Sequence, residues 1–209
     1  MTETSGHRIR DQRLDTLVRV TVDEISRVGI EGASLNRIIA AAGMSKSSFY
    51  HFVDSKAALI DLVTQSLLDD VARRWTAPAV ESFAGDDFWE RVDTVLAELA
   101  AASAADAALQ RLGDLFAAQP DGAAGVQQRF LASVGRWVHG VLDAGRRAGQ
   151  VRDDLPLDLQ AQIIFAVLRT VDQWVLAHGG HRGADVGIDE TEPARLLRRL
   201  LRREDPPAG

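Results

Sequence analysis

Hydrophobic residues recur at steps of three and four through the N-terminal third of the chain, the spacing that places side chains on one helix face. There are two such stripes. The one further along the chain covers residues 35–42, which is only two turns of helix, and it follows Ser34, a residue type that caps helix N-termini. Gly43 is expected to end this helix, because glycine enters the left-handed C-cap conformation without strain. The first stripe predicts a helix over about residues 11–28 that stops at Gly29, and it consists of Leu14, Leu17, Val18, Val22, Ile25 and Val28.

A third helix is predicted over about residues 45–52. Ser45 can cap its N-terminus, and Phe49 and Phe52 lie three residues apart, so both are expected to point inward. Two aromatic anchors matter here because a helix this short does not persist without packing. The polar side chains between them are left for the flanks and the opposite face.

The rest of the chain keeps the helical periodicity, with glycine, proline and aspartate between the segments and no alternating strand pattern. A fourth helix, capped by Asp54 or Ser55, continues toward Trp75 and ends before Pro78. The pattern predicts an all-α fold of about nine helices: an N-terminal three-helix helix-turn-helix domain and a larger helical C-terminal domain. The domains are expected at residues 10–70, with the motif at 33–52, and at 71–209. Later helices are predicted over residues 87–101, 104–118, 124–148, 157–177 and 193–203.

The amino-acid composition excludes several kinds of site and a membrane-spanning segment. The chain has no cysteine, which excludes a disulfide framework, a thiolate zinc site and a cysteine nucleophile, and which suits the reducing cytoplasm. Charged and polar residues interrupt every apolar stretch before the roughly 20 residues needed to cross a bilayer, and the N-terminus lacks an apolar signal core. We therefore expect a cytoplasmic protein with no membrane partner.

Charge is distributed unevenly along the chain. The net charge of −6 argues against a polyanionic partner, but residues 1–56 carry eight Lys and Arg against seven Asp and Glu. The remaining residues carry 16 against 23, so the acidity belongs to the C-terminal part. The N-terminal part is no basic patch either, and its charge permits DNA binding without demanding it.

A two-turn helix, a turn that starts at a glycine and a second short helix with a polar outer face can present one helix to the major groove of DNA. Lys46 is the candidate for reading a guanine, although in another context it would be an ordinary surface lysine. Tyr50, His51 and Lys56 would reach phosphates, with backbone N–H groups at two helix starts adding anion sites. The candidate DNA-binding residues are Ser34, Ser45, Lys46, Ser47, Ser48, Tyr50, His51 and Lys56.

Residues 34–56 closely resemble the DNA-binding signature of the TetR family of regulators, and the resemblance extends over about residues 10–70. Met44 stands where members usually have Val, Phe49 where they usually have Leu, and neither change removes a phosphate-binding position. The family typically shows Thr or Ser opening the second helix, an Ile-Ala pair, Ala-Gly-Val-Ser at the turn, Tyr with an aromatic or His and then Phe, and Ser/Asn-Lys. Here these correspond to Ser34, Ile39-Ala40, Ala42-Gly43-Met44-Ser45, Tyr50-His51-Phe52 and Ser55-Lys56.

The resemblance implies a transcriptional regulator, commonly a repressor, whose C-terminal domain binds a small molecule and dimerises through its last two helices. Two wide apolar stripes near the C-terminus support a homodimer. Dimerisation would hold two recognition helices about 34–36 Å apart on a palindromic operator in double-stranded DNA. The candidate interface residues are Ile164, Leu168, Val171, Val175, Leu197, Leu200 and Leu201.

Aromatic residues gather in the C-terminal domain, where they could line the pocket of an unknown small-molecule effector or simply form core. An effector that prefers one separation of the two N-terminal domains would release the operator. A glycine-rich loop with His178, His181 and Asp185 is better explained as an exposed hinge than as a metal site. The candidate ligand-binding residues are Trp89, Phe116, Trp137, Phe165 and Trp174.

Two other classes of protein remain as alternatives. One is an enzyme with an all-helical catalytic domain, for which no Ser/His/Asp spacing, phosphate-binding glycine loop or other catalytic set stands out. The other is a dimeric interaction protein that has lost DNA binding. We expect no enzyme activity, no cofactor and no metal. Strong, salt-dependent binding to promoter DNA would separate a regulator from both alternatives.

Overall fold

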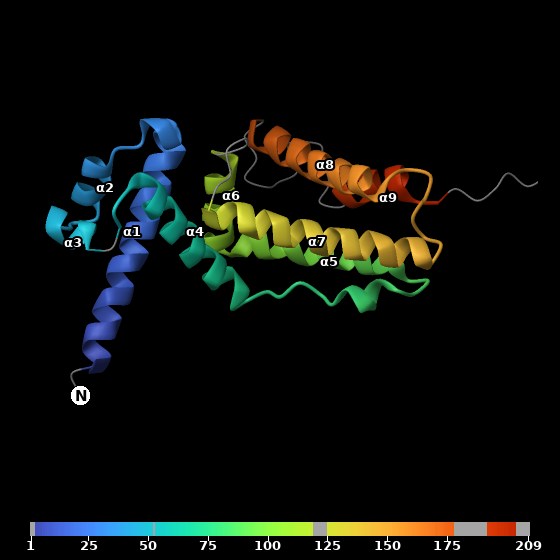
Figure 1. The fold of residues 1–209 in the computed structure, drawn as a ribbon, viewed down its shortest axis with the longest axis horizontal. Helices are drawn as coiled ribbons and strands as arrows, with labels where there is room; N and C mark the ends of the chain where they lie inside the picture. Colours follow the sequence, from blue (N-terminus) through green and yellow to red (C-terminus); the bar gives the residue numbers. More distant parts are fainter. Residues whose placement is uncertain (1–2, 52, 119–124, 178–191, 204–209) are drawn as a thin grey trace, which may run out of the picture. The chain divides into compact units, whose positions relative to one another are not determined.

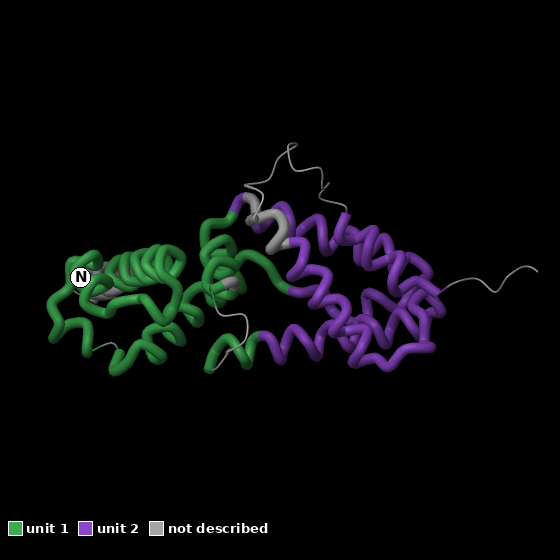
Figure 2. The backbone as a smooth tube through the Cα atoms, turned by 90° about the horizontal axis from the view of Figure 1, so that it is seen from above, with its two compact units in different colours: residues 1–76, 106–130 green, residues 77–105, 131–209 purple. Residues whose placement is uncertain are grey.

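The computed structural model describes residues 3–51, 53–118, 125–177 and 192–203 (Figure 1). Within these ranges the regular elements are nine α-helices, one short 3-10 helix and a single antiparallel bridge between Val151 and Arg202. The predicted all-α class is confirmed. The chain divides into two compact units, residues 1–76 with 106–130 (unit 1) and residues 77–105 with 131–209 (unit 2), which Figure 2 colours green and purple.

Unit 1 contains the N-terminal helices that the hydrophobic stripes predict. The first helix is longer than expected, and its backbone is interrupted at Gly29 (φ 71°, ψ 169°), where the apolar stripe ends. A left-handed φ is accessible to glycine without steric cost, so the chain turns there before a further short helical segment. The helices of this unit are α1 (Glu3–Gly32), α2 (Leu35–Ala41), α3 (Lys46–Tyr50), α4 (Lys56–Ala72) and α6 (Ala107–Ala117).

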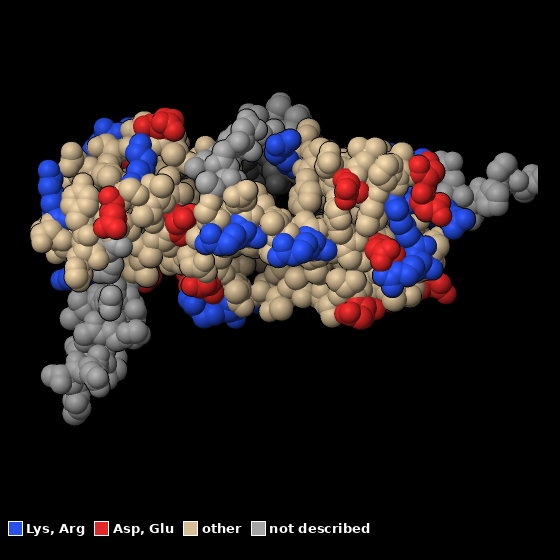
Figure 3. Space-filling view, in the orientation of Figure 1, with Lys and Arg blue, Asp and Glu red and all other residues tan. Residues whose placement is uncertain are grey.

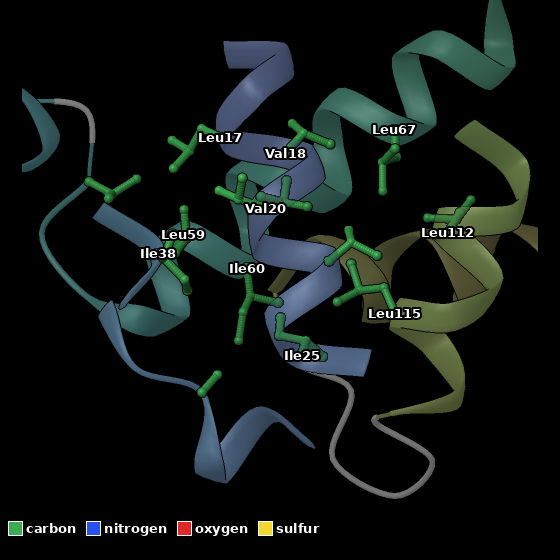
Figure 4. Close-up of a cluster of buried hydrophobic side chains, with 14 of the residues drawn as sticks. Leu17, Val18, Val20, Ile25, Ile38, Leu59, Ile60, Leu67, Leu112 and Leu115 are labelled. Atoms are coloured by element: carbon green, nitrogen blue, oxygen red, sulfur yellow. The ribbon is translucent and has the colours of Figure 1, made fainter. Parts of the chain in front are cut away.

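A single hydrophobic cluster joins these helices. In Figure 4, Val18 of α1 and Leu67 of α4 lie in the same cluster as Leu112 and Leu115 of α6, and all four are buried. The sequence placed α6 in the C-terminal domain, because its apolar stripe shows that one face is covered but not what covers it. The compact unit that holds the helix-turn-helix therefore extends beyond the expected residues 10–70.

Helix α7 (Gly125–Arg147) begins in unit 1 with a cap from another helix. Asp61 of α4 accepts a hydrogen bond from the backbone N–H of Val126 through Oδ1, at 3.0 Å. Gly125 adopts φ +61°, and a Cβ at this position would overlap the Asp61 carboxylate. Because the first N–H groups of a helix have no partner within it, this carboxylate satisfies a donor that the sequence next to α7 leaves open.

Unit 2 has a core built largely from aromatic side chains. Phe83 and Phe88 are fully buried and meet edge to face at 6.2 Å, and Phe83 also packs against Trp137 at 5.8 Å. Phe83 lies in a one-turn 3-10 helix that the periodicity did not predict, because four residues are too few to show a period. The elements of this unit are η1 (Val80–Phe83), α5 (Phe88–Ala105), the larger part of α7, α8 (Leu157–Ala177) and α9 (Glu192–Leu201).

The last helix is fastened to the rest of unit 2 by polar contacts. Arg152 donates its backbone N–H to Leu201 O at 2.9 Å, next to the antiparallel bridge. Arg198 pairs with Asp93 of α5 at 2.6 Å and lies over the Trp89 ring. None of the described helices combines the length and hydropathy that spanning a membrane requires.

Candidate nucleic-acid interface

The turn between α2 and α3 is held by a paired set of backbone hydrogen bonds. Gly43 adopts φ 62° and donates its N–H to Ala40 O at 3.1 Å, and Met44 donates to Ile39 O at 3.1 Å. This pair of bonds after a left-handed glycine is the Schellman arrangement, which satisfies the last carbonyls of a helix and turns the chain sharply. The prediction that Gly43 ends α2 in the left-handed conformation is confirmed.

Helix α3 has only five residues and is held by an N-cap and by one buried side chain. Ser45 accepts a hydrogen bond from the Ser48 N–H at 3.1 Å and donates its hydroxyl to Ser48 Oγ at 2.9 Å, which confirms the predicted N-cap. Phe49 is completely buried, as predicted, and meets the Tyr50 ring edge to face at 5.4 Å. Phe52, the second predicted anchor, lies outside the described residues.

The outer face of α3 is polar and exposed. Lys46, Ser47 and His51 are exposed, and Tyr50 is 49% exposed although it is a large aromatic residue. Figure 3 shows blue and red side chains interspersed over the helix-turn-helix end of unit 1, with no continuous basic patch on this face. Groups that can donate and accept hydrogen bonds are thus exposed along and just after α3. The hydroxyl groups of Ser45 and Ser48 are hydrogen-bonded to each other, which leaves fewer of their donors and acceptors for DNA.

Lys56, which was predicted to contact DNA, already has partners within the protein. Lys56 donates from Nζ to Ile30 O at 3.0 Å and to Glu31 O at 3.1 Å, so it joins the start of α4 to the end of α1. Two of its three N–H donors are thereby used, and one remains. Ser34 stands at the N-cap of α2, but its side chain caps no N–H group, and Ser55 is the residue that caps α4.

A buried carboxylate that the sequence analysis missed lies beside this site. Glu24 is 8% exposed and accepts hydrogen bonds from Arg27 at 2.6 Å, Arg37 at 2.7 Å and the Ser34 N–H at 3.1 Å. The hydrogen bond from Arg27, with those from Ser34 and Arg37, outweighs burial and lowers the pKa of Glu24 from 4.5 to about 2. A signal was present: Glu24 falls among Leu17, Thr21 and Val28 at helical spacing, on the inner face of α1.

The candidate ligand-binding aromatics are divided between the two units. Trp89 and Trp137 belong to unit 2, where their indole N–H groups donate to Gln150 O at 3.2 Å and to Pro78 O at 2.8 Å. Phe165 is partly buried on α8, and Phe116 lies in unit 1 beside Phe130 at 5.8 Å. The side chain of Trp174 lies outside the described part, as does the loop with His178, His181 and Asp185.

The candidate dimer residues divide by exposure. Leu197 and Leu201 are 4% and 2% exposed, because they face the core of their own unit, whereas Leu200 is 42% exposed. Of the three leucines of α9 that were expected at an interface, only Leu200 is thus exposed on the single chain. On α8, Ile164, Leu168 and Val171 are partly buried, and the side chain of Val175 lies outside the described part.

Comparison with known proteins matches the same N-terminal region. The family model for bacterial regulatory proteins of the tetR family matches residues 17–63. A curated relative, the uncharacterized helix-turn-helix-type transcriptional regulator YvdT of Bacillus subtilis, is 27% identical over 100 residues. That match covers 46% of this chain and 45% of the relative, so it spans about half the length of the protein to which it corresponds.

Solved structures with the same fold extend over nearly the whole chain. A TetR family transcription regulator from Marinobacter aquaeolei has a TM-score of 0.65 and 20% identity, covering 95% of this chain and all of its own. SmeT, the repressor of the Stenotrophomonas maltophilia efflux pump SmeDEF, has a TM-score of 0.65 and 13% identity, covering 91% of each chain. NalD, a repressor of the Pseudomonas aeruginosa pump MexAB-OprM, has a TM-score of 0.60 and 14% identity, covering 93% of this chain and 99% of its own.

At such identities these structures establish the fold alone. The left-handed glycine of the helix-turn-helix and the serine-capped α3 both lie within residues 17–63, which the family model matches. The N-terminal region of the chain is therefore similar to that of bacterial regulatory proteins of the TetR family.

Proposed function

We propose that the chain is a DNA-binding transcriptional repressor that binds a palindromic operator as a homodimer and is released by a small-molecule effector. The observation that carries the proposal is the α3 surface: a short helix with one face anchored by Phe49 and the other exposing Lys46, Ser47, Tyr50 and His51. A rigidly held helix with polar groups at its N-terminal end is what direct readout in the major groove requires. The matched family comprises regulators, which are not enzymes.

Each DNA contact has a chemical role. Lys46 reads a guanine and the nearby Ser47 serves several bases, while Tyr50 and His51 bind phosphates from the flanks of α3. Lys56 keeps one N–H donor beyond its two carbonyl partners and contributes it to a phosphate. Ser34, Ser45 and Ser48 contribute less, since the hydroxyls of Ser45 and Ser48 are bonded to each other.

Repression and dimerisation are the finer parts of the proposal. SmeT and NalD, which share the fold, are described as repressors, and this supports the same sign of regulation here. One recognition helix reads too few base pairs for specificity, so two copies are needed. Exposed Leu200 of α9, with the partly buried Ile164, Leu168 and Val171 of α8, supports a helical interface between copies. The effector would bind among unit 2 aromatics, and the protein would act in the cytoplasm.

Selection from a pool of random DNA duplexes tests the proposal. The full chain is expected to enrich a palindrome with half-sites about one helical turn apart and to bind it with an affinity that falls steeply as salt rises. Tyr50→Phe removes one hydroxyl from the exposed face and is expected to weaken binding to all sequences alike. Enrichment of no sequence, with no binding even at low salt, would refute DNA binding.

A further inference from the structure

The inner face of α1 carries one buried acid, and its partners come from the next helix. The Glu24 carboxylate accepts the Ser34 N–H at 3.1 Å and Arg37 Nε at 2.7 Å, so both the first residue before α2 and a side chain of its first turn are held by one group. Arg27, on α1 itself, supplies the third donor at 2.6 Å. Glutamate is almost never this buried without partners, and here every partner is a donor.

Arg37 extends the connection to the end of α1. Its Nη2 donates to Gly32 O at 2.9 Å, while Nε bonds to Glu24. The planar guanidinium presents its donors in a fixed fork, so two simultaneous bonds define both the distance and the angle between α1 and the start of α2. A lysine at this position could supply the charge but not the fork.

The direction of α2 is passed on to α3 by a rigid turn. The Met44 N–H bond to Ile39 O and the left-handed Gly43 fix the chain between the two helices, and the Ser45 cap sets where α3 begins. Helix α3 makes its own anchorage through the buried Phe49. A rotation of α2 about its first residue would therefore move α3 with it.

We propose that Glu24 is a positioning residue for DNA binding, whose carboxylate fixes the start of α2 and thereby the direction in which α3 meets the groove, without touching DNA. The inference rests on the proposed function and deepens it. It assigns part of sequence-specific recognition to a buried acid on α1, although acids ordinarily oppose DNA binding through their charge.

The test compares two isosteric substitutions on adjacent residues of the full chain. Glu24→Gln and Asp23→Asn each remove one negative charge, but the Asp23 side chain is exposed and pairs with exposed Arg19 at 3.7 Å. With the operator selected from random duplexes by the wild-type protein, Glu24→Gln is expected to bind about tenfold more weakly. Asp23→Asn should bind as the wild type does. Both should bind random duplex at least as well as the wild type, because charge repulsion is lower.

Variants at Arg37 distinguish positioning from general stability. Arg37→Met should lose operator affinity as Glu24→Gln does, and adding Glu24→Gln to it should cost little more. Arg37→Lys, which keeps the charge, should recover part of the loss. The inference is overturned if Glu24→Gln binds the operator as Asp23→Asn does, or if it loses affinity for operator and random duplex equally while losing helical circular dichroism. If Glu24→Gln does not fold, Arg37→Met decides in the same assay, because its side chain is largely exposed.

Hydrogen exchange on the free protein separates this inference from DNA binding itself. Glu24→Gln is expected to speed amide exchange over residues 35–50, and Asp23→Asn is not, with residues 56–72 unchanged in both. If the wild-type protein selects no DNA, the proposed function fails, while exchange still reports whether Glu24 holds α2. Equal exchange in both variants would overturn the positioning role even if the operator is found.

Discussion

Glu24 and Lys56 show how much the context of a charged residue determines its effect. Glu24 is nearly buried and bonded to three donors, and Lys56 bonds two carbonyls of α1 from the start of α4. By contrast, Arg147 and Asp143 form an exposed pair within α7, and such pairs contribute little because water and ions screen them. The polar connections among α1, α2 and α4 therefore depend on a few partly buried groups.

Glu24 predicts a specific acid dependence of stability. Its folded-state pKa is lowered to about 2 from 4.5, so its contribution is complete above pH 4.5 and is lost as the pH falls from 4.5 toward 2. Glu24→Gln should be less stable than the wild type at pH 7, and its stability should fall less steeply over that acid range. Urea unfolding at several pH values measures this, with Asp23→Asn as the control. A variant with the acid slope of the wild type would contradict the assignment.

Individual residues were predictable from sequence where the interaction is local. Ser45 and Ser48 are three residues apart, and the capping role of Ser45 follows from residue type and position. Glu24 and Lys56 bond to backbone 10 and 26 residues away, at Ser34 and Ile30. Nothing in the spacing of a sequence reports such partners, so their contacts appeared only in the structure.

At the scale of elements, the turn after α2 offers a clean test of backbone strain. Gly43 has φ +62° with nothing within 4 Å of an added Cβ, so Gly43→Ala introduces strain without a clash. It should destabilise unit 1 by about 1–2 kcal/mol, since a non-glycine residue in this conformation costs roughly that much. Thermal or urea unfolding measures the change.

Gly113 provides the matched control within α6. An added Cβ there also meets nothing within 4 Å, but the residue is helical, so Gly113→Ala should stabilise the protein by about 0.5–1 kcal/mol. Opposite signs for the same substitution would show that backbone conformation is the cause. Equal stability of the two variants would mean that the turn at Gly43 relaxes into another conformation.

The helices themselves were largely predictable, and their partners were not. The apolar stripe and flanking residues gave the bounds of α8, residues 157–177, without error, because periodicity is a property of the segment alone. The same reasoning placed α6 outside the N-terminal unit, although Leu112 and Leu115 lie in its core. An apolar stripe shows that one face of a helix is covered. Only the three-dimensional packing shows which residues cover it.

At the scale of the whole molecule, α9 shows the same limit. Three of its leucines, Leu197, Leu200 and Leu201, were expected at a dimer interface, but Leu197 and Leu201 are buried within unit 2, whereas Leu200 is exposed. Arg198 on the same helix pairs with Asp93, which fixes which face of α9 points inward. In the proposed dimer, a second copy can therefore contact α9 only on its outward face, which carries Leu200.

This arrangement predicts which substitution separates the proposed dimer. Leu200→Glu places a charge on the exposed face and should yield monomers, because burying an unpaired carboxylate at an interface is strongly unfavourable. Leu131→Glu, on the exposed face of α7, should leave the dimer intact. Sedimentation equilibrium measures both. A dimer that persists in Leu200→Glu would move the interface elsewhere.

The division into units also determines how the chain could be cut. The polypeptide passes from one unit to the other after residues 76, 105 and 130, so three covalent connections join the two units. Cleavage of one connection would give two fragments, which the packing of segments within each unit would still hold together. A fragment of residues 1–76 alone would lack α6. The buried side chains of Val18 and Leu67 would then lose the apolar contacts that this helix supplies to their cluster. A chimeric protein that is to contain a folded unit 1 therefore needs residues 106–130 as well as residues 1–76.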